Sequence, residues 1–231
     1  MPSFVPSPPL PTLPLTLTDG HLFVDVDGDR WLLDTGAPSS FGARRALTLA
    51  GERFELDDAM LGLNAEVLSE YVGVPCTGLL GADVLNGFDH RIDVPGGVLT
   101  LTTDTIAHEG EALPVELFMG IPVVTARVGE RAHRMFFDTG AQLSYLQHDA
   151  LGSYPPMGTV TDFYPGVGRF ETDTHQVPVA LGALTFSLRC GSLPMLLGMT
   201  LMMAGTEGII GNTVLQDRPV CYAPRRGVLV L

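Results

Sequence analysis

The tetrapeptide Asp-Thr-Gly-Ala occurs twice in the chain, beginning at Asp34 and at Asp138, and each copy follows three apolar residues. In a chain of this size a given tetrapeptide is expected by chance in about one sequence in a thousand. An aspartate on a tight turn, followed by a small hydroxyl residue and a glycine, can hold a carboxylate at the floor of a cleft. Two such aspartates related by a duplication can meet across a pseudo-twofold axis and share one proton, because like charges at close range cannot both ionise cheaply. The pair then combines a base that deprotonates a water with an acid that protonates a carbonyl oxygen.

A second pair of segments shows that the duplication extends beyond this motif. Residues 79–101 (LLGADVLNGFDHRIDVPGGVLTL) and residues 209–231 (IIGNTVLQDRPVCYAPRRGVLVL) align without a gap. The stretch that separates the motif from these segments is 26 residues longer in the second copy. Because a true duplication keeps the order of its segments, the repeat predicts two similar lobes, and the longer stretch must hold an additional element.

Length and composition fit two lobes of about a hundred residues each, since 45% of the residues are hydrophobic. We place an extended proline-rich arm at residues 1–14, an N-terminal lobe at residues 15–108 and a C-terminal lobe at residues 109–231. A single chain then supplies both motifs, so we expect a monomer. The formal net charge of −13 disfavours nucleic acid and anionic membranes as partners, because both require a positive field.

Cysteine and histidine patterns give no indication of a metal or another cofactor. Cys76, Cys190 and Cys221 lack metal-binding or disulfide spacing and are expected to be free thiols in a reducing compartment. The six histidines show no ligand spacing and are expected at the surface. They are His21, His90, His108, His133, His148 and His175. The first residues are too interrupted by proline for a signal helix, and no apolar run reaches membrane-spanning length, so we expect a cytoplasmic protein.

Short β-prone runs separated by turn residues precede each motif. Three of them lie at residues 15–18, 22–25 and 30–33. The last two are joined through Asp27-Gly28, a tight-hairpin signature. The same hairpin recurs at residues 123–128 and 134–137, ahead of the second motif.

Helical patterning is scarce. It is limited to residues 64–71, with Asn64 as N-cap, and to short segments after Gly81 and Gly211. Because 27 glycines and 18 prolines punctuate many short β-prone runs, the sequence predicts an all-β protein.

The two Asp-Thr-Gly-Ala motifs, each followed downstream by two apolar residues and a glycine, resemble the aspartic proteases of the pepsin and retropepsin group. Retroviral-type enzymes use this tetrapeptide and assemble from two identical chains, whereas pepsins carry two lobes in one chain. This chain looks like a fused, single-chain retropepsin-like protein with both features. The resemblance implies a bilobal acid-protease fold with two similar β-barrel-like lobes related by a pseudo-twofold axis.

The resemblance also implies roles for the motif residues. Asp34 and Asp138 would be the catalytic dyad. Thr35 and Thr139 would interlock beneath it by hydrogen bonds. The remaining dyad-supporting residues, which would shape the turns, are Gly36 and Gly140. Residues 79–81 and 209–211 would pass behind the motif loops and pack them.

The longer second copy offers a candidate flap, the mobile hairpin that closes over substrate in pepsins. Residues 159–186 read as two strand-like arms around a tip that runs from Tyr164 to Gly168. The corresponding residues 43–78 show no comparable hairpin, although pepsins carry their flap in the first lobe. An ordinary surface hairpin is therefore the alternative for residues 159–186. The residues expected to contact a substrate are Ala37, Ala141, Tyr164, Gly166 and Gly168.

Two further features are expected to be structural. Met195–Met203 (MLLGMTLMM) is expected to pack in the core, with an apolar wall of the substrate cleft as the alternative. The adjacent pairs Arg44-Arg45 and Arg225-Arg226 are expected to be solvated charges rather than a binding patch.

The leading functional prediction is an aspartic endopeptidase that binds an extended peptide or protein substrate across the lobe interface. Hydrolysis would proceed through a water held by Asp34 and Asp138. A non-catalytic peptide-binding module of the same fold is the competing class, and the presence of both aspartates and both threonines favours the enzyme over it. A protease restricted to self-processing is a third alternative, in which the proline-rich arm occludes the cleft or is trimmed.

Overall fold

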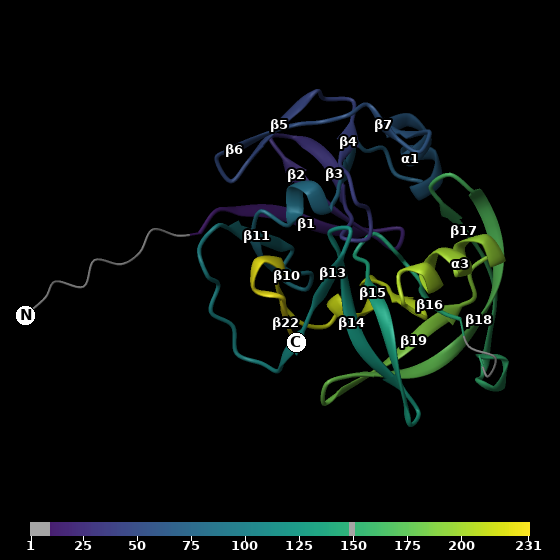
Figure 1. Ribbon diagram of the computed structural model, residues 1–231. Helices are drawn as coiled ribbons and strands as arrows, with labels where there is room; N and C mark the ends of the chain where they lie inside the picture. The colour runs from purple at the N-terminus through teal and green to yellow at the C-terminus, as the bar shows by residue number, and fades with distance from the viewer. Residues whose placement is uncertain (1–9, 148–150) are drawn as a thin grey trace, which may run out of the picture.

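The computed structural model describes residues 10–147 and 151–231, and most of its regular structure is β (Figure 1). Two large sheets, one of ten strands and one of eight, organise the chain. The all-β, two-lobed architecture expected from the sequence is thereby confirmed.

The first half of the chain contains strands β1 to β11 and two helices. The bounds are β1 Thr12–Thr18, β2 His21–Val26, β3 Asp29–Leu33, β4 Phe41–Gly42, β5 Ala46–Leu49, β6 Glu52–Glu55, β7 Ala59–Met60, β8 Leu63–Asn64, α1 Ala65–Val72, β9 Gly78–Leu80, α2 Ala82–Leu85, β10 Asp89–Asp93 and β11 Val98–Thr102.

The second half repeats this order with a longer middle section. The bounds are β12 Ala112–Pro114, β13 Glu116–Phe118, β14 Ile121–Val128, β15 Arg131–Phe137, β16 Ser144–Leu146, η1 Leu151–Ser153, β17 Pro156–Tyr164, β18 Gly168–Leu181, β19 Leu184–Gly191, α3 Met195–Met203, β20 Gly208–Ile210, η2 Asn212–Leu215, β21 Val220–Ala223, η3 Pro224–Arg226 and β22 Val228–Val230.

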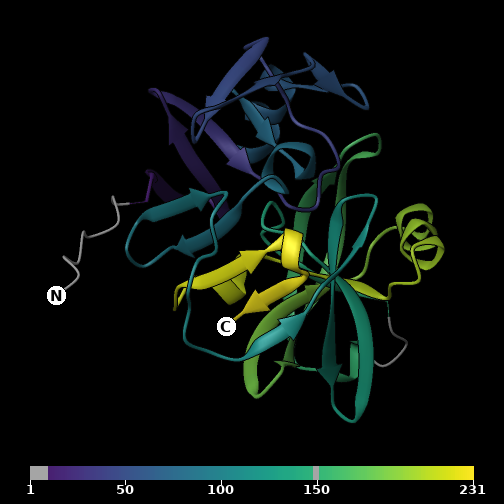
Figure 2. The same cartoon turned by 60° about the vertical axis from the view of Figure 1, so that its left-hand side comes forward.

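The duplicated segments pair with each other within the ten-stranded sheet. Its first six strands run in the order β12-β22-β21-β10-β11-β1, which reads as the same arrangement from either end because β21 and β22 repeat β10 and β11. At the centre β10 and β21 are antiparallel, with His90 opposite Tyr222 and Ile92 opposite Val220. The last strands, yellow in Figure 2, thus extend the sheet that the first half begins. This sheet crosses the expected boundary between residues 108 and 109, which itself lies between β11 and β12.

Local signals in the sequence match the elements around them. Asp27 and Gly28 have φ of 53° and 84°, the left-handed pair that a tight hairpin requires, and they join β2 to β3. Asn64 caps α1, because its side chain accepts a hydrogen bond from the Val67 N–H at 2.9 Å. Short helical segments follow Gly81 and Gly211, as expected. β1 begins at Thr12, within the expected arm, because residues 12–14 pair with β11.

The prediction that Met195–Met203 packs in the core is wrong. The segment forms α3, in which Met195, Leu196, Met199, Met202 and Met203 are each at least 56% exposed. Leu197, Gly198 and Leu201 alone are buried. Within the described ranges, no helix combines the length and hydropathy needed to span a membrane.

Three histidines and one arginine pair are more buried or better paired than expected. His21, His90 and His133 are at most 3% exposed, whereas His148 lies outside the described residues. Burial lowers the pKa of His90 to about 4.

Arg226 contacts the buried carboxylate of Asp89 at 2.6 Å, and Arg225 contacts it at 3.3 Å. This pair is therefore not merely solvated, because a buried carboxylate needs a counter-charge.

Candidate active site

The two motif loops lie side by side at the ends of equivalent strands. β3 ends just before Asp34, and its neighbour in the sheet is the parallel strand β9. β15 ends just before Asp138, and its parallel neighbour is β20. The backbone N–H of Asp34 donates to the carbonyl of Leu80 at 3.0 Å, and that of Asp138 donates to Ile210 at 2.9 Å. The Leu-Leu-Gly and Ile-Ile-Gly stretches therefore lie directly behind the loops.

Thr35 and Thr139 lock the two loops together. The Thr35 N–H donates to the Thr139 hydroxyl oxygen at 3.0 Å, and the Thr139 N–H donates to the Thr35 hydroxyl oxygen at the same distance. Each hydroxyl then donates across to the other lobe at 2.7 Å, Thr35 to the Phe137 carbonyl and Thr139 to the Leu33 carbonyl. Both side chains are buried, and each hydroxyl both donates and accepts a hydrogen bond.

Backbone N–H groups hold each carboxylate in place. Asp34 Oδ1 accepts from the N–H groups of Gly36 and Ala37, both at 2.9 Å. Asp138 Oδ1 accepts in the same way from Gly140 at 2.9 Å and Ala141 at 3.1 Å. Within the described residues no side-chain hydroxyl bonds to either carboxylate.

The motif glycines are needed for space rather than for an unusual backbone conformation. Neither Gly36 nor Gly140 has positive φ. A Cβ on Gly36 would overlap the carboxyl group of Asp138, and a Cβ on Gly140 would overlap that of Asp34. Only glycine permits the two loops to approach this closely.

The two carboxyl groups are partly buried and act on each other's ionisation. Burial raises the pKa of Asp34 well above its usual value of 3.8, and repulsion from Asp138 adds to this shift. Burial also raises the pKa of Asp138, although the hydrogen bond with Asp34 and the backbone N–H groups oppose the rise. The pair can therefore hold one shared proton between its two carboxyl groups.

A buried serine supports each loop, and sequence reasoning missed both. The Ser40 hydroxyl accepts from the Gly81 N–H at 2.8 Å, and the Ser144 hydroxyl accepts from the Gly211 N–H at 3.1 Å. Each serine lies three residues after the motif alanine, so an extended Asp-Thr-Gly-Ala-x-x-Ser repeat is present in both copies. That repeat was the signal that could have found them.

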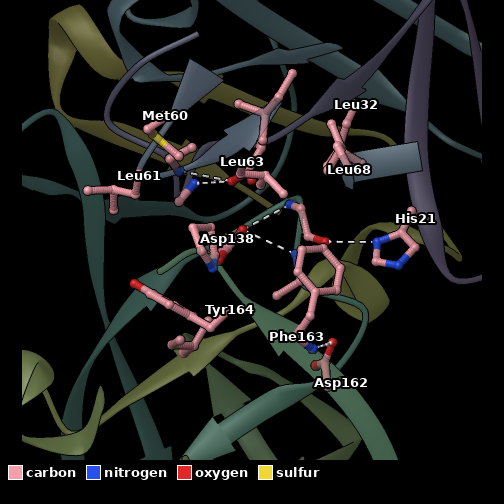
Figure 3. A pocket seen from close by; sticks show the side chains of 18 of the residues that line it. His21, Leu32, Met60, Leu61, Leu63, Leu68, Asp138, Asp162, Phe163 and Tyr164 are labelled. Atoms are coloured by element: carbon pink, nitrogen blue, oxygen red, sulfur yellow. Dashed lines mark hydrogen bonds between the residues drawn. The ribbon is translucent and has the colours of Figure 1, made fainter. Parts of the chain in front are cut away.

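The dyad lies on the floor of a pocket with one wall from each half of the chain. The first wall is apolar and includes Leu32, Leu63, Leu68 and Leu79. The second includes Tyr145, Tyr164, Phe170, Leu193 and Ile209. In Figure 3, Met60, Leu61 and Leu63 lie on one side of Asp138 and Tyr164 lies on the other. No residue of α3 is among the described residues that line this pocket, so α3 is not its apolar wall either.

The β17–β18 hairpin reaches from the second half across the pocket to the first. Arg169 donates to the carbonyl of Glu70 at 3.1 Å, and the rings of Phe163 and Tyr71 lie 4.9 Å apart. Of the expected substrate-contacting residues, Ala37, Ala141 and Tyr164 line the pocket. Gly166 and Gly168 do not; they face Leu61 and the Tyr71 hydroxyl of the first half. Burial raises the pKa of Tyr164 to about 12, and the charges of Asp138 and Asp34 act in the same direction.

Residues 43–78 contain short hairpins that the sequence did not reveal. β5 pairs with β6, and β7 pairs with β8. The turn between β7 and β8 consists of Leu61 and Gly62, with φ of 51° and 81°. Leu61 lines the pocket and is 72% exposed. The Leu61–Gly62 turn is therefore a small tip of the first lobe that faces the tip of the β17–β18 hairpin. The sequence did not predict it, because strands of two residues show no periodicity.

Three further polar residues line the pocket and were not singled out from the sequence. His21 Nδ1 lies 3.1 Å from the carbonyl oxygen of Gly140, so it joins the first lobe to the second motif loop. The Tyr145 hydroxyl donates to Asp162 Oδ2 on β17. Burial lowers the pKa of His21.

No group of three or more His, Cys, Asp or Glu side chains in the described part of the chain could hold a metal ion.

Comparisons with known proteins identify the fold. No protein-family model and no curated protein matches the sequence. Among solved structures, the crystal structure of basic 7S globulin from soybean is similar, with 11% sequence identity and a TM-score of 0.53. The match covers 96% of this chain and 94% of the globulin chain. The chain therefore has the pepsin-like fold of basic 7S globulin over nearly its whole length.

Proposed function

We propose that the chain is an aspartic endopeptidase that hydrolyses peptide bonds with the dyad of Asp34 and Asp138. The observation that supports this most is the convergence of two partly buried carboxyl groups, one from each repeat, on the floor of a pocket. Their raised pKa values suit a pair that shares a proton. The interlocked threonines fix the distance between the loops, which proton transfer requires.

In this mechanism the dyad starts with one shared proton, drawn on Asp34 while Asp138 is ionised. The Asp138 carboxylate takes a proton from a water held between the two groups, and the water oxygen attacks the peptide carbonyl carbon. Asp34 donates its proton to the carbonyl oxygen, which gives a tetrahedral diol. Asp138 then protonates the leaving nitrogen while Asp34 takes a hydroxyl proton from the diol, so the C–N bond breaks and the starting protonation state returns.

A second candidate is a non-catalytic peptide-binding module that uses the same cleft. The comparison with solved structures favours it, because the similar structure is named a globulin and not a peptidase. Fold likeness at this identity carries no activity with it. The two candidates share the cleft and differ only in whether the dyad hydrolyses the bound peptide.

The deciding experiment is incubation of the purified chain with a diverse peptide library from pH 3 to pH 8, with products identified by mass spectrometry. The matched controls are Asp34→Asn and Asp138→Asn, which are near-isosteric but cannot share a proton. An endopeptidase cleaves as wild type, and each variant loses at least about a hundredfold in kcat/KM. Equal binding of peptides by all three proteins, without cleavage, would establish the binding module instead. Incubating the chain alone reports any self-processing.

We also propose that the active species is a cytoplasmic monomer. Both half-sites come from one chain, and the three cysteines are free. Specific activity should then be independent of protein concentration. An activity that falls on dilution, in parallel with dissociation of a dimer in sedimentation, would refute the monomer.

A further inference from the structure

The pocket carries negative charge that no basic side chain balances. Among the described residues, its ionisable lining consists of the dyad, Asp162, His21 and two tyrosines, without an arginine. The remaining described lining residues are almost all apolar. The pocket therefore offers a charged acceptor outside the reacting pair.

Asp162 is held in place by neutral donors alone. It lies on β17, is 8% exposed and lines the pocket. Its Oδ2 accepts from the Tyr145 hydroxyl, and its Oδ1 accepts from the Phe163 N–H at 2.8 Å. Within the described ranges Asp162 forms no salt bridge with an arginine. Because each carboxylate oxygen can accept more than one hydrogen bond, capacity remains for a further donor.

His21, the other polar residue on this side of the pocket, does not neutralise Asp162. Its ring lies 6.2 Å from that of Phe163, the neighbour of Asp162 (Figure 3). Burial holds the pKa of His21 below its usual value, against the opposing effect of Asp162. A buried carboxylate without a protein cation is costly to maintain, and a cationic ligand group would offset that cost.

We propose that Asp162 makes the cleft selective for peptides that carry an arginine or lysine side chain close to the bond over the dyad. The inference rests on the proposed peptide-binding function of this cleft. A guanidinium or ammonium group would donate hydrogen bonds to the carboxylate oxygens of Asp162, while its aliphatic stem packs against the apolar wall. The net charge of −13 attracts such peptides to the chain.

The test uses fluorogenic octapeptides of one scaffold in which arginine, lysine, norleucine or glutamate replaces each position in turn. For wild type, arginine or lysine at one position should give a kcat/KM at least about tenfold above norleucine, and glutamate should be poorest. Asp162→Asn keeps an acceptor for Tyr145 but removes the charge, so this ratio should fall to about one. Because the ratio is measured within one protein, it does not depend on the folded fraction.

Two controls separate charge from structure. Tyr145→Phe removes the hydrogen bond that holds Asp162 but keeps the charge, so the basic preference should persist. Asp173→Asn removes an exposed carboxylate on the neighbouring strand β18 and should leave the ratio as in wild type. Absence of basic preference in wild type, its retention in Asp162→Asn, or equal loss in Asp173→Asn would each overturn the proposal.

A binding measurement distinguishes this proposal from the peptidase. Fluorescence anisotropy of the same peptides with Asp138→Asn, and with Asp138→Asn combined with Asp162→Asn, reports selectivity without turnover. Basic peptides should bind the first protein at least about tenfold more tightly than norleucine peptides, and the second protein should lose this preference. Selective binding without hydrolysis by wild type would sustain the role of Asp162 and refute the peptidase, whereas hydrolysis without selectivity would do the reverse.

Discussion

Gly36 lies against the carboxyl group of Asp138 so closely that a methyl group on its Cα would overlap the carboxyl carbon. The repeat equivalent, Gly140, has the same relationship to Asp34. Each motif thus supplies the aspartate of its own half-site and the space for the aspartate of the other. The two carboxyl groups can approach only because both glycines lack a side chain.

Gly36→Ala or Gly140→Ala should therefore separate the loops. We expect at least about a hundredfold loss of kcat/KM and a loss of roughly 1–3 kcal/mol in the free energy of unfolding, from overpacking. Peptide hydrolysis and urea unfolding provide the measurements. Gly152→Ala is the matched control, since Gly152 has ordinary φ and open space around its Cα. Full activity in either motif variant would contradict the close approach.

The free energy of unfolding should fall as pH rises, because the pKa values of the dyad are raised in the folded protein. A carboxyl group whose folded pKa is raised contributes stability that is present below its unfolded value, near 3.8, and is lost as pH rises through the folded value. Asn is neutral throughout, so Asp34→Asn should raise Tm relative to wild type at pH 8, and the difference should shrink at pH 3. Thermal unfolding of both proteins across this range checks it. A Tm difference that does not change with pH would argue against the shifted pair.

Closure over a peptide should depend on both facing tips. Tyr164→Ala should lower kcat/KM by at least about tenfold, because closure excludes water and positions the peptide. Leu61→Asn should also lower it, while the turn is preserved because asparagine tolerates the φ of 51°. Met119→Asn is the control, since Met119 is equally exposed and has the same φ in the turn between β13 and β14. If Met119→Asn lowers kcat/KM as much as Leu61→Asn, the effect does not come from the cleft.

The alanines that close the motifs should set the pH dependence. Ala37 and Ala141 give each aspartate a backbone N–H but no hydroxyl. Fewer donors to the charged form raise the apparent pKa values of the pair, so a bell-shaped kcat/KM profile should be centred at about pH 5 to 6. Ala37→Ser or Ala141→Ser adds a donor and should move at least one limb to lower pH. A wild-type optimum near pH 2 to 3 would show that another charge dominates.

The duplicated motif, the turns and the caps could be read from the sequence because they follow local rules. Asp27-Gly28 requires left-handed backbone, Asn64 offers a side-chain acceptor to Val67, and the repeat itself demanded that Asp34 and Asp138 be equivalent. For these features, sequence order and residue type are sufficient.

Burial and partnership were decided by the tertiary structure, because both depend on segments far apart in the chain. An apolar run such as Met195–Met203 reads as core, yet its exposure depends on whether another element covers it. In the sequence Asp162 is one polar residue of a predicted hairpin. In the fold, β17 places it in the pocket and Tyr145 of β16 donates a hydrogen bond to it. The residue types of the repeat therefore determined the dyad, while long-range packing alone determined which other side chains surround it.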